Sequence, residues 1–173
     1  MTNTRDKLNE AKYFLEKMRE AASDPDKVRY ELTAFLSASR SITQIMQKEF
    51  SGKPGFIDWY TQKQKEMAQN GTLKYLHRQR SITFHEHPVL PYPIKATSQI
   101  SDAKGMRVFF SGTGSALDLN SGFVSFPAIQ PKTIVRYYFD DMPHEDRDVV
   151  TICTEAISAL ETVVNECESK FCS

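Results

Sequence analysis

The chain has 173 residues, of which 40% are hydrophobic and 25% charged, and its 22 Lys and Arg residues balance 22 Asp and Glu residues. This composition is typical of a globular protein with one well-filled core, and the length is too short for two full domains. The sequence lacks any run of the roughly 18 apolar residues that a membrane span needs, and its polar N-terminus lacks the apolar core of a secretion signal. We therefore expect a cytoplasmic protein that is not associated with a membrane.

The charges are distributed unevenly between the two halves of the chain. Residues 1–87 hold 15 Lys and Arg against 11 Asp and Glu, a net charge of +4, so the remainder carries −4. One interpretation is two solvated faces without a special role. The other is a local anion-binding patch, or two complementary surfaces in an oligomer.

The spacing of apolar residues predicts four helices in the first half of the chain. Leu8, Ala11, Leu15 and Met18 recur at intervals of three and four residues, which places them on one helical face. Asp24-Pro25 is typical of a helix N-cap followed by proline at the first helical position. The fourth helix should end before Pro88, because a residue that precedes proline disfavours the helical conformation. The expected helices cover residues 4–22, 25–51, 56–68 and 72–87.

The residue pattern in the second half of the chain predicts strands followed by a long helix. Residues after Pro88 form a proline-rich extended connector, and short segments that favour strands follow at residues 95–100, 106–111, 123–126 and 133–139. Residues 145–171 show the clearest helical pattern, in which Cys153 and Cys167 lie two heptads apart in an apolar stripe. Because free cysteine is often buried, we expect these two residues to be core thiols.

These elements together predict an α-dominated α+β fold. An antiparallel helical bundle would carry a small antiparallel β meander inserted before the C-terminal helix, which returns to pack on the bundle. Along the chain this gives a helical segment at residues 1–87, a connector and meander at residues 88–143, and a final helix at residues 144–173. We expect the three segments to form one structural domain.

Two arginines and three of the four histidines lie close together at the end of the fourth expected helix. On that helix, Leu73, Leu76, Arg80 and Phe84 fall within one narrow sector, so Arg80 lies in an apolar stripe. Burying an unpaired arginine costs several kcal/mol. Arg80 should therefore either pair with a buried carboxylate or be kept for a ligand or an interface. The candidate carboxylates are Glu31 and Asp58.

Arg80 and His85 form an R-x4-H arrangement that suits phosphate chemistry. Arginine binds phosphate through a planar fork of donors, and histidine can transfer a proton near neutral pH, so the pair could cleave RNA without a metal. On an unbroken helix the two side chains point about 140° apart, so they converge only if the helix unwinds or a second subunit completes the site. Neighbouring side chains are candidates for binding substrate: Lys74, His77, Arg78 and Ser81.

The histidines also allow a metal-binding interpretation. His85 and His87 would share one side of an extended chain, and His77 is a possible third ligand. No acidic residue or cysteine has the spacing of a further ligand, so structural or surface roles for these histidines are the preferred alternative. We expect neither a metal nor a cofactor.

At this position the sequence resembles the HEPN superfamily, small helical proteins that share an R-x4-6-H motif. The resemblance covers residues 5–87 as helical architecture, and Arg80 and His85 as the signature. Ser81 stands where the family usually has asparagine or another polar residue. Residues 34–41, the Trp59-Tyr60 pair and residues 80–86 are also similar to a group of bacterial proteins of the same layout.

The resemblance implies a homodimer in which the motifs of two subunits meet in a cleft. Many HEPN proteins are RNases of toxin–antitoxin or defence systems, whereas others have lost catalysis and serve as binding or assembly modules. The leading interpretation is therefore a homodimeric RNase or RNA-binding protein with Arg80 and His85 as catalytic residues and an antitoxin or another protein as partner. The alternative is a non-catalytic homodimeric interaction module.

Overall fold

The computed structural model describes residues 1–97, 133–141 and 147–172. It divides into two units: residues 1–93 with 137–173, which we call the helical unit, and residues 94–136. Within the described residues there are five helices and one antiparallel sheet of two strands that precedes the C-terminal helix, which confirms the predicted fold class. The elements are α1 (Asn3–Glu20), α2 (Pro25–Phe50), α3 (Phe56–Gln69), α4 (Gly71–His85), β1 (Tyr92–Thr97), β2 (Thr133–Tyr138) and α5 (Val149–Phe171).

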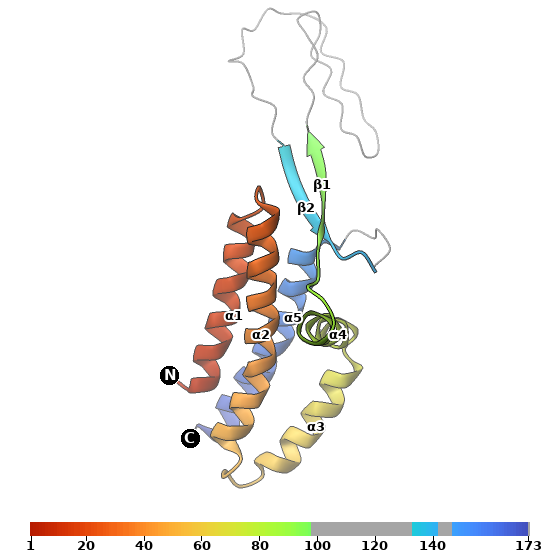
Figure 1. The fold of residues 1–173 in the computed structure, drawn as a ribbon. Coiled ribbons are helices and arrows are strands. Elements are labelled where there is room, and N and C mark those ends of the chain that lie inside the picture. The colour runs from red at the N-terminus through yellow and green to blue at the C-terminus, as the bar shows by residue number, and fades with distance from the viewer. Residues whose placement is uncertain (98–132, 142–146, 173) are drawn as a thin grey trace, which may run out of the picture. The chain divides into compact units, whose positions relative to one another are not determined.

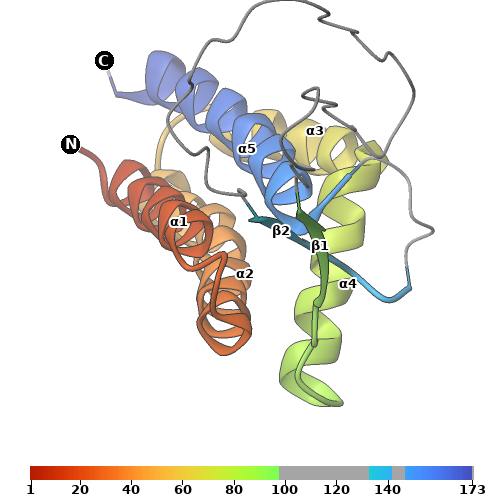
Figure 2. The same cartoon turned by 90° about the horizontal axis from the view of Figure 1, so that it is seen from above.

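Helices α1 and α2 form an antiparallel hairpin and lie side by side in both views (Figures 1 and 2). The predicted cap is confirmed, since the Asp24 side chain accepts a hydrogen bond from the Lys27 backbone N–H and Pro25 is the first helical residue. The predicted apolar face of α1 is buried at Leu8, Ala11, Leu15 and Met18. Burial of this face drives the pairing of the two helices.

Helix α5 packs against α1 and α2, and it also contacts α4. The predicted core thiols are confirmed, because Cys153 and Cys167 are both 0% exposed. Burial raises the pKa of both thiols, that of Cys167 to about 12. The helix was expected from residue 145 and starts at Val149, where the Asp148 side chain caps it by accepting from Thr151 N–H at 2.7 Å.

The start of α1 is tied to the end of α2. The Glu49 carboxylate accepts hydrogen bonds from the backbone N–H of Asn3 at 2.9 Å and of Thr4 at 2.8 Å, and from the Thr4 hydroxyl at 2.6 Å. Burial alone would raise the pKa of Glu49, but these hydrogen bonds hold it below the ordinary value. Glu49 thus satisfies backbone donors that α1 itself leaves free at its first turn.

Helices α3 and α4 are short and cover one side of α2 and α5 (Figure 1). Gly55 starts α3 with φ at +76°, a left-handed conformation that favours glycine. The Asn70 side chain caps α4 by accepting from Leu73 N–H at 3.0 Å. Helix α4 ends at His85, before Pro88, as the sequence predicts.

The strands agree with the prediction in part. β2 lies within the expected segment 133–139, whereas β1 starts at Tyr92 and includes Pro93, which we had placed in the connector. Among the described residues the sheet has two strands, each of them an edge strand, and an edge strand accepts proline because one row of its N–H groups is unpaired. The expected strands at residues 106–111 and 123–126 lie outside the described residues.

None of the helices in the described part of the chain combines the length and the hydrophobicity needed to cross a membrane.

Candidate functional site

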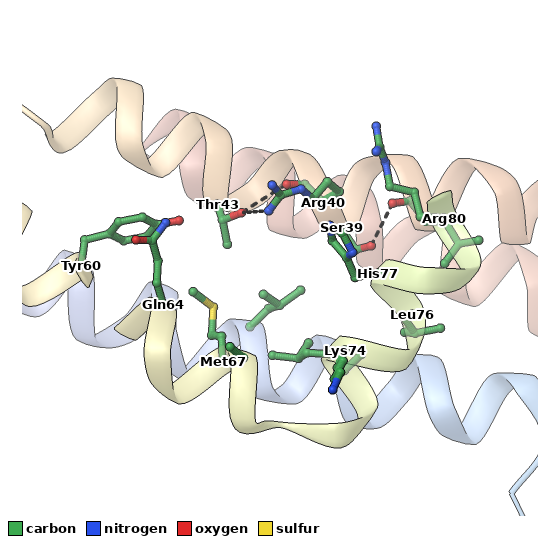
Figure 3. Close-up of a pocket in the computed structure, with 15 residues that line it drawn as sticks. Ser39, Arg40, Thr43, Tyr60, Gln64, Met67, Lys74, Leu76, His77 and Arg80 are labelled. Atoms are coloured by element: carbon green, nitrogen blue, oxygen red, sulfur yellow. Dashed lines mark hydrogen bonds between the residues drawn. The ribbon is translucent and has the colours of Figure 1, made fainter. Parts of the chain in front are cut away.

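A cavity of about 530 Å³ lies between α2, α3, α4 and α5 in the helical unit. Its walls include apolar side chains of all four helices, among them Leu36, Met67, Leu76 and Leu160. Figure 3 shows Tyr60 and Gln64 at one end of the cavity and Arg80 at the other, with Arg40 and His77 between them. The cavity has the volume of an ordinary small-molecule site.

The polar part of the wall carries three basic side chains and a histidine. Arg40 comes from α2, and Lys74, His77 and Arg80 come from successive turns of α4. No carboxylate is among the residues that line the cavity. Within the described residues, none of these four side chains forms an ion pair. The cavity wall therefore carries positive charge that no ion pair among the described residues neutralises.

Arg80 is the least satisfied of these side chains. Its Nε is buried and has no hydrogen-bond partner among the described residues. Its guanidinium carbon lies 5.1 Å from the centre of the Phe84 ring, a cation–π distance. Neither Glu31 nor exposed Asp58 bonds to Arg80, so the described part of the chain offers no support for a buried ion pair at this residue.

Arg40 is held on the α2 wall. Its Nη1 lies 3.3 Å from the Thr43 hydroxyl oxygen, one turn along the same helix (Figure 3). This bond uses one of the five guanidinium N–H donors and leaves the others for a ligand. At the far end of the cavity, the Tyr60 hydroxyl accepts a hydrogen bond from the Gln47 side chain at 2.9 Å. This bond uses the acceptor side of the Tyr60 hydroxyl, and Gln64 is a second polar residue at that end.

Helix α4 does not bring Arg80 and His85 together. It remains helical from Gly71 through His85, so the two residues lie about 140° apart around its axis. His85 is exposed and is not part of the cavity wall. Joint chemistry of this pair would need a second subunit, which stays a prediction.

The four expected substrate-binding residues divide into two groups. Lys74 and His77 line the cavity, although the Lys74 amine points away from α2 (Figure 3). Arg78 and Ser81 are not in the cavity wall. The Arg78 side chain is 68% exposed, and its Nη1 lies 3.7 Å from the Asp141 carboxylate.

Sequence reasoning missed Arg40. The signal was present, because Leu36, Arg40 and Thr43 follow helical spacing and so share the face of α2 that meets α3 and α4. A charged residue in that register, within a stretch rich in small residues, indicates a polar site between helices.

Sequence reasoning also missed the role of Asp141. Its carboxylate accepts from the Tyr75 hydroxyl at 2.5 Å and from the Gln79 amide at 3.0 and 3.1 Å. Burial and the bond to Asp141 raise the pKa of Tyr75. Asp141 therefore fastens the segment after β2 to the face of α4 that is turned away from the cavity lining.

The described part of the chain does not contain a cluster of metal ligands. No group of three or more His, Cys, Asp and Glu side chains there is arranged to hold a metal ion. His77 lines the cavity, and His85 and His87 are exposed beyond it.

Comparison with protein families gives a match over α1, α2, α3 and most of α4. Residues 1–83 match the model of the family described as bacteriophage lambda protein ea47. Comparison with curated proteins gives no match, and comparison with solved structures gives none.

The resemblance to the HEPN superfamily is wrong, because the family that matches over the same helices is a different one. The match includes Arg80 but ends before His85. Two residues at one spacing occur in many unrelated helices, and the unbroken α4 separates these two around its axis. Over residues 1–83, the chain is similar to the bacteriophage lambda protein ea47 family.

Proposed function

We propose that the chain is a non-catalytic binding module that holds an anionic ligand in the cavity between α2, α3, α4 and α5. One observation carries the proposal: half-buried Arg40 and Arg80 line the cavity beside exposed Lys74 and His77, and no carboxylate is among the described residues of the lining. A folded chain normally pairs its partly buried cations, because an unpaired charge in a poorly solvated site is costly. Cations that stay unpaired in a cavity are suited to a partner that arrives from solution.

The chemistry of the two arginines supports an anion rather than a neutral ligand. Guanidinium groups stay charged at all physiological pH values and offer a planar fork of donors that matches carboxylates and phosphates. The Arg80 guanidinium contacts the Phe84 ring, and no carboxylate among the described residues pairs with it.

RNA, the partner expected from the sequence, has less support. A protein that tracks a nucleic-acid backbone uses an extended surface of unpaired basic residues. Here the exposed helix faces carry basic residues that pair with acids three positions away, as in Lys7–Glu10, Lys17–Glu20 and Lys63–Glu66. The net charge of the chain is zero. Catalysis by Arg80 and His85 has less support for the separate reason that α4 keeps them apart.

Titration with 1-anilinonaphthalene-8-sulfonate, a fluorescent aromatic anion, tests the proposal. Arg80→Met and Arg40→Met should each weaken binding about 10–100-fold, the loss expected for one charged hydrogen-bonding group. Arg78→Met is the matched control, since it removes the same charge from α4 outside the cavity. It should change the affinity by less than about twofold, in keeping with an exposed charge.

Equal weakening by all three substitutions would contradict the proposal, as would the absence of saturable binding. A single-stranded RNA that binds the wild type and is lost equally in Arg78→Met and Arg80→Met would favour the nucleic-acid interpretation.

Assembly is a separate proposal. Phe84 at the end of α4 is 47% exposed and Leu90 is 63% exposed, so apolar surface lies next to the fourth helix. We propose a two-fold dimer that buries this surface. Light scattering at tens of micromolar should give twice the chain mass, and Leu90→Glu should shift it to the monomer. A monomeric wild type would remove the dimer and any composite Arg80–His85 site, but not the cavity.

A further inference from the structure

We infer that the ligand of this cavity is an amphipathic monocarboxylate, with its acidic head near Arg40 and Arg80 and an aliphatic body along α3 and α5. The inference rests on the proposed function and adds the chemical class of the ligand.

The cavity wall has a charged part and an apolar part. The three cationic side chains, Arg40, Lys74 and Arg80, come from α2 and α4, as does His77. Helix α5 contributes only apolar side chains, Ala156 and Leu160, and α3 contributes Met67 and Ala68 beside its two polar residues. A ligand that satisfies both sides must carry charge on one part and hydrocarbon on another.

The positions of the free hydrogen-bond donors indicate where the head group of the ligand binds. Arg80 is at the end of the cavity opposite Tyr60, whose hydroxyl is already bonded to Gln47. The Lys74 amine points away from α2 (Figure 3), so the head group is left to Arg40, Arg80 and His77. The Met67 side chain points into the space between the two ends, where it offers a flexible apolar contact for a hydrocarbon body.

The apolar wall disfavours a ligand whose body is strongly polar. A nucleotide or sugar phosphate would bring a ring of hydroxyl and nitrogen groups against the leucines, methionine and alanines of the wall. Those groups would lose water without gaining partners, which weakens binding. An alkyl chain has no hydrogen bonds with water to give up there. Each methylene that it buries should tighten binding about fourfold.

Calorimetric titration of the full chain with straight-chain carboxylates from butanoate to dodecanoate tests the inference. We expect the dissociation constant to fall about fourfold per methylene and then to level off when the cavity is filled. Arg80→Met should weaken every chain length by the same factor and leave the slope unchanged. The alcohol of equal length should bind more weakly than the acid to the wild type, and this difference should shrink in Arg80→Met, where Arg40 remains.

Two variants test the apolar wall separately from the head group. Met67→Ala enlarges the cavity, so the dissociation constant should level off at a longer carboxylate chain than in the wild type. Ala156→Leu fills it and should move the levelling-off to shorter chains, with a thermal melt to check that the fold is kept. If Ala156→Leu does not fold, Met67→Ala still decides, because Met67 is only half-buried. No change in chain-length preference with Met67→Ala would overturn the inference.

The outcome also separates this inference from the proposed function. Binding of adenosine monophosphate or inorganic phosphate that depends on Arg80, together with no binding of any carboxylate, would overturn the aliphatic ligand and leave the anion site standing. Absence of Arg80-dependent binding for the sulfonate probe, the phosphates and the carboxylates would overturn both.

Discussion

The guanidinium carbon of Arg80 lies 5.1 Å from the centre of the Phe84 ring, one turn further along α4. This contact places an aromatic face, rather than a carboxylate, beside the charge. It can hold the side chain in position without satisfying its hydrogen-bond donors. Arg80 thus rests on an aromatic ring, with no acidic partner among the described residues.

Phe84→Leu should weaken binding of the sulfonate probe about 2–5-fold, because a cation–π contact at a partly exposed site is worth about 0.5–1 kcal/mol. Leucine keeps the apolar character of the position and removes only the ring. Fluorescence titration measures the change, with Tyr92→Leu as the control for a ring that packs on Tyr138 rather than on Arg80. Affinity unchanged by Phe84→Leu would mean that the ring does not position Arg80.

Arg80→Met should change the free energy of unfolding by less than about 1 kcal/mol, with either sign. Breaking a buried ion pair would instead cost about 3–5 kcal/mol, because a carboxylate would remain uncompensated. The described residues show no such pair at Arg80. Urea unfolding of the variant beside the wild type distinguishes the two cases, and a loss in the larger range would make Arg80 a structural residue.

Asp141→Ala should destabilise the helical unit by about 1–3 kcal/mol, because it leaves the buried amide of Gln79 without its acceptor. Gln79 is only 2% exposed, so water cannot readily take the place of the carboxylate. The neighbouring Asp140→Ala removes the same charge from an exposed position and should have little effect. Thermal melts of the two variants should therefore differ; equal melting temperatures would show that Asp141 does not fasten α4.

Acid should destabilise the protein in part through Glu49. Its pKa is held below the ordinary value in the folded state, so its contribution is fully present above the unfolded pKa of about 4.3. That contribution is lost as the pH falls through the folded pKa. Glu49→Gln should therefore be less stable than the wild type at pH 7, and the difference should shrink towards pH 3. Glu86→Gln, at an exposed position, is the control. A difference that is constant over this range would contradict the assignment.

Local signals in the sequence were sufficient for the helices. The Asp24-Pro25 cap, the spacing of Leu8 and Met18, and the heptads of Cys153 and Cys167 each depend on residues close together in the chain, and each is confirmed. The start of β1 was harder to predict because Pro93 is accepted only by an edge strand. That property depends on how many strands the sheet has, which no local pattern contains.

The candidate site could be predicted only in part for the same reason. Arg80 was singled out because it interrupts an apolar stripe on its own helix, and the structure places it in the cavity wall. Its neighbours Arg40 and Leu160 come from α2 and α5, and their meeting depends on the packing of helices far apart in sequence. Asp141 was equally hidden, since its partners Tyr75 and Gln79 precede it by more than 60 residues.

The central claim is that unpaired arginines in this cavity recognise the charge of an anion. The most direct measurement is the ratio of affinities for 1-anilinonaphthalene-8-sulfonate and for neutral N-phenyl-1-naphthylamine, which has the same aromatic body without the sulfonate. The wild type and Arg78→Met should prefer the sulfonate at least about tenfold, and Arg80→Met should lose most of that preference. The same ratio in all three proteins would contradict the account.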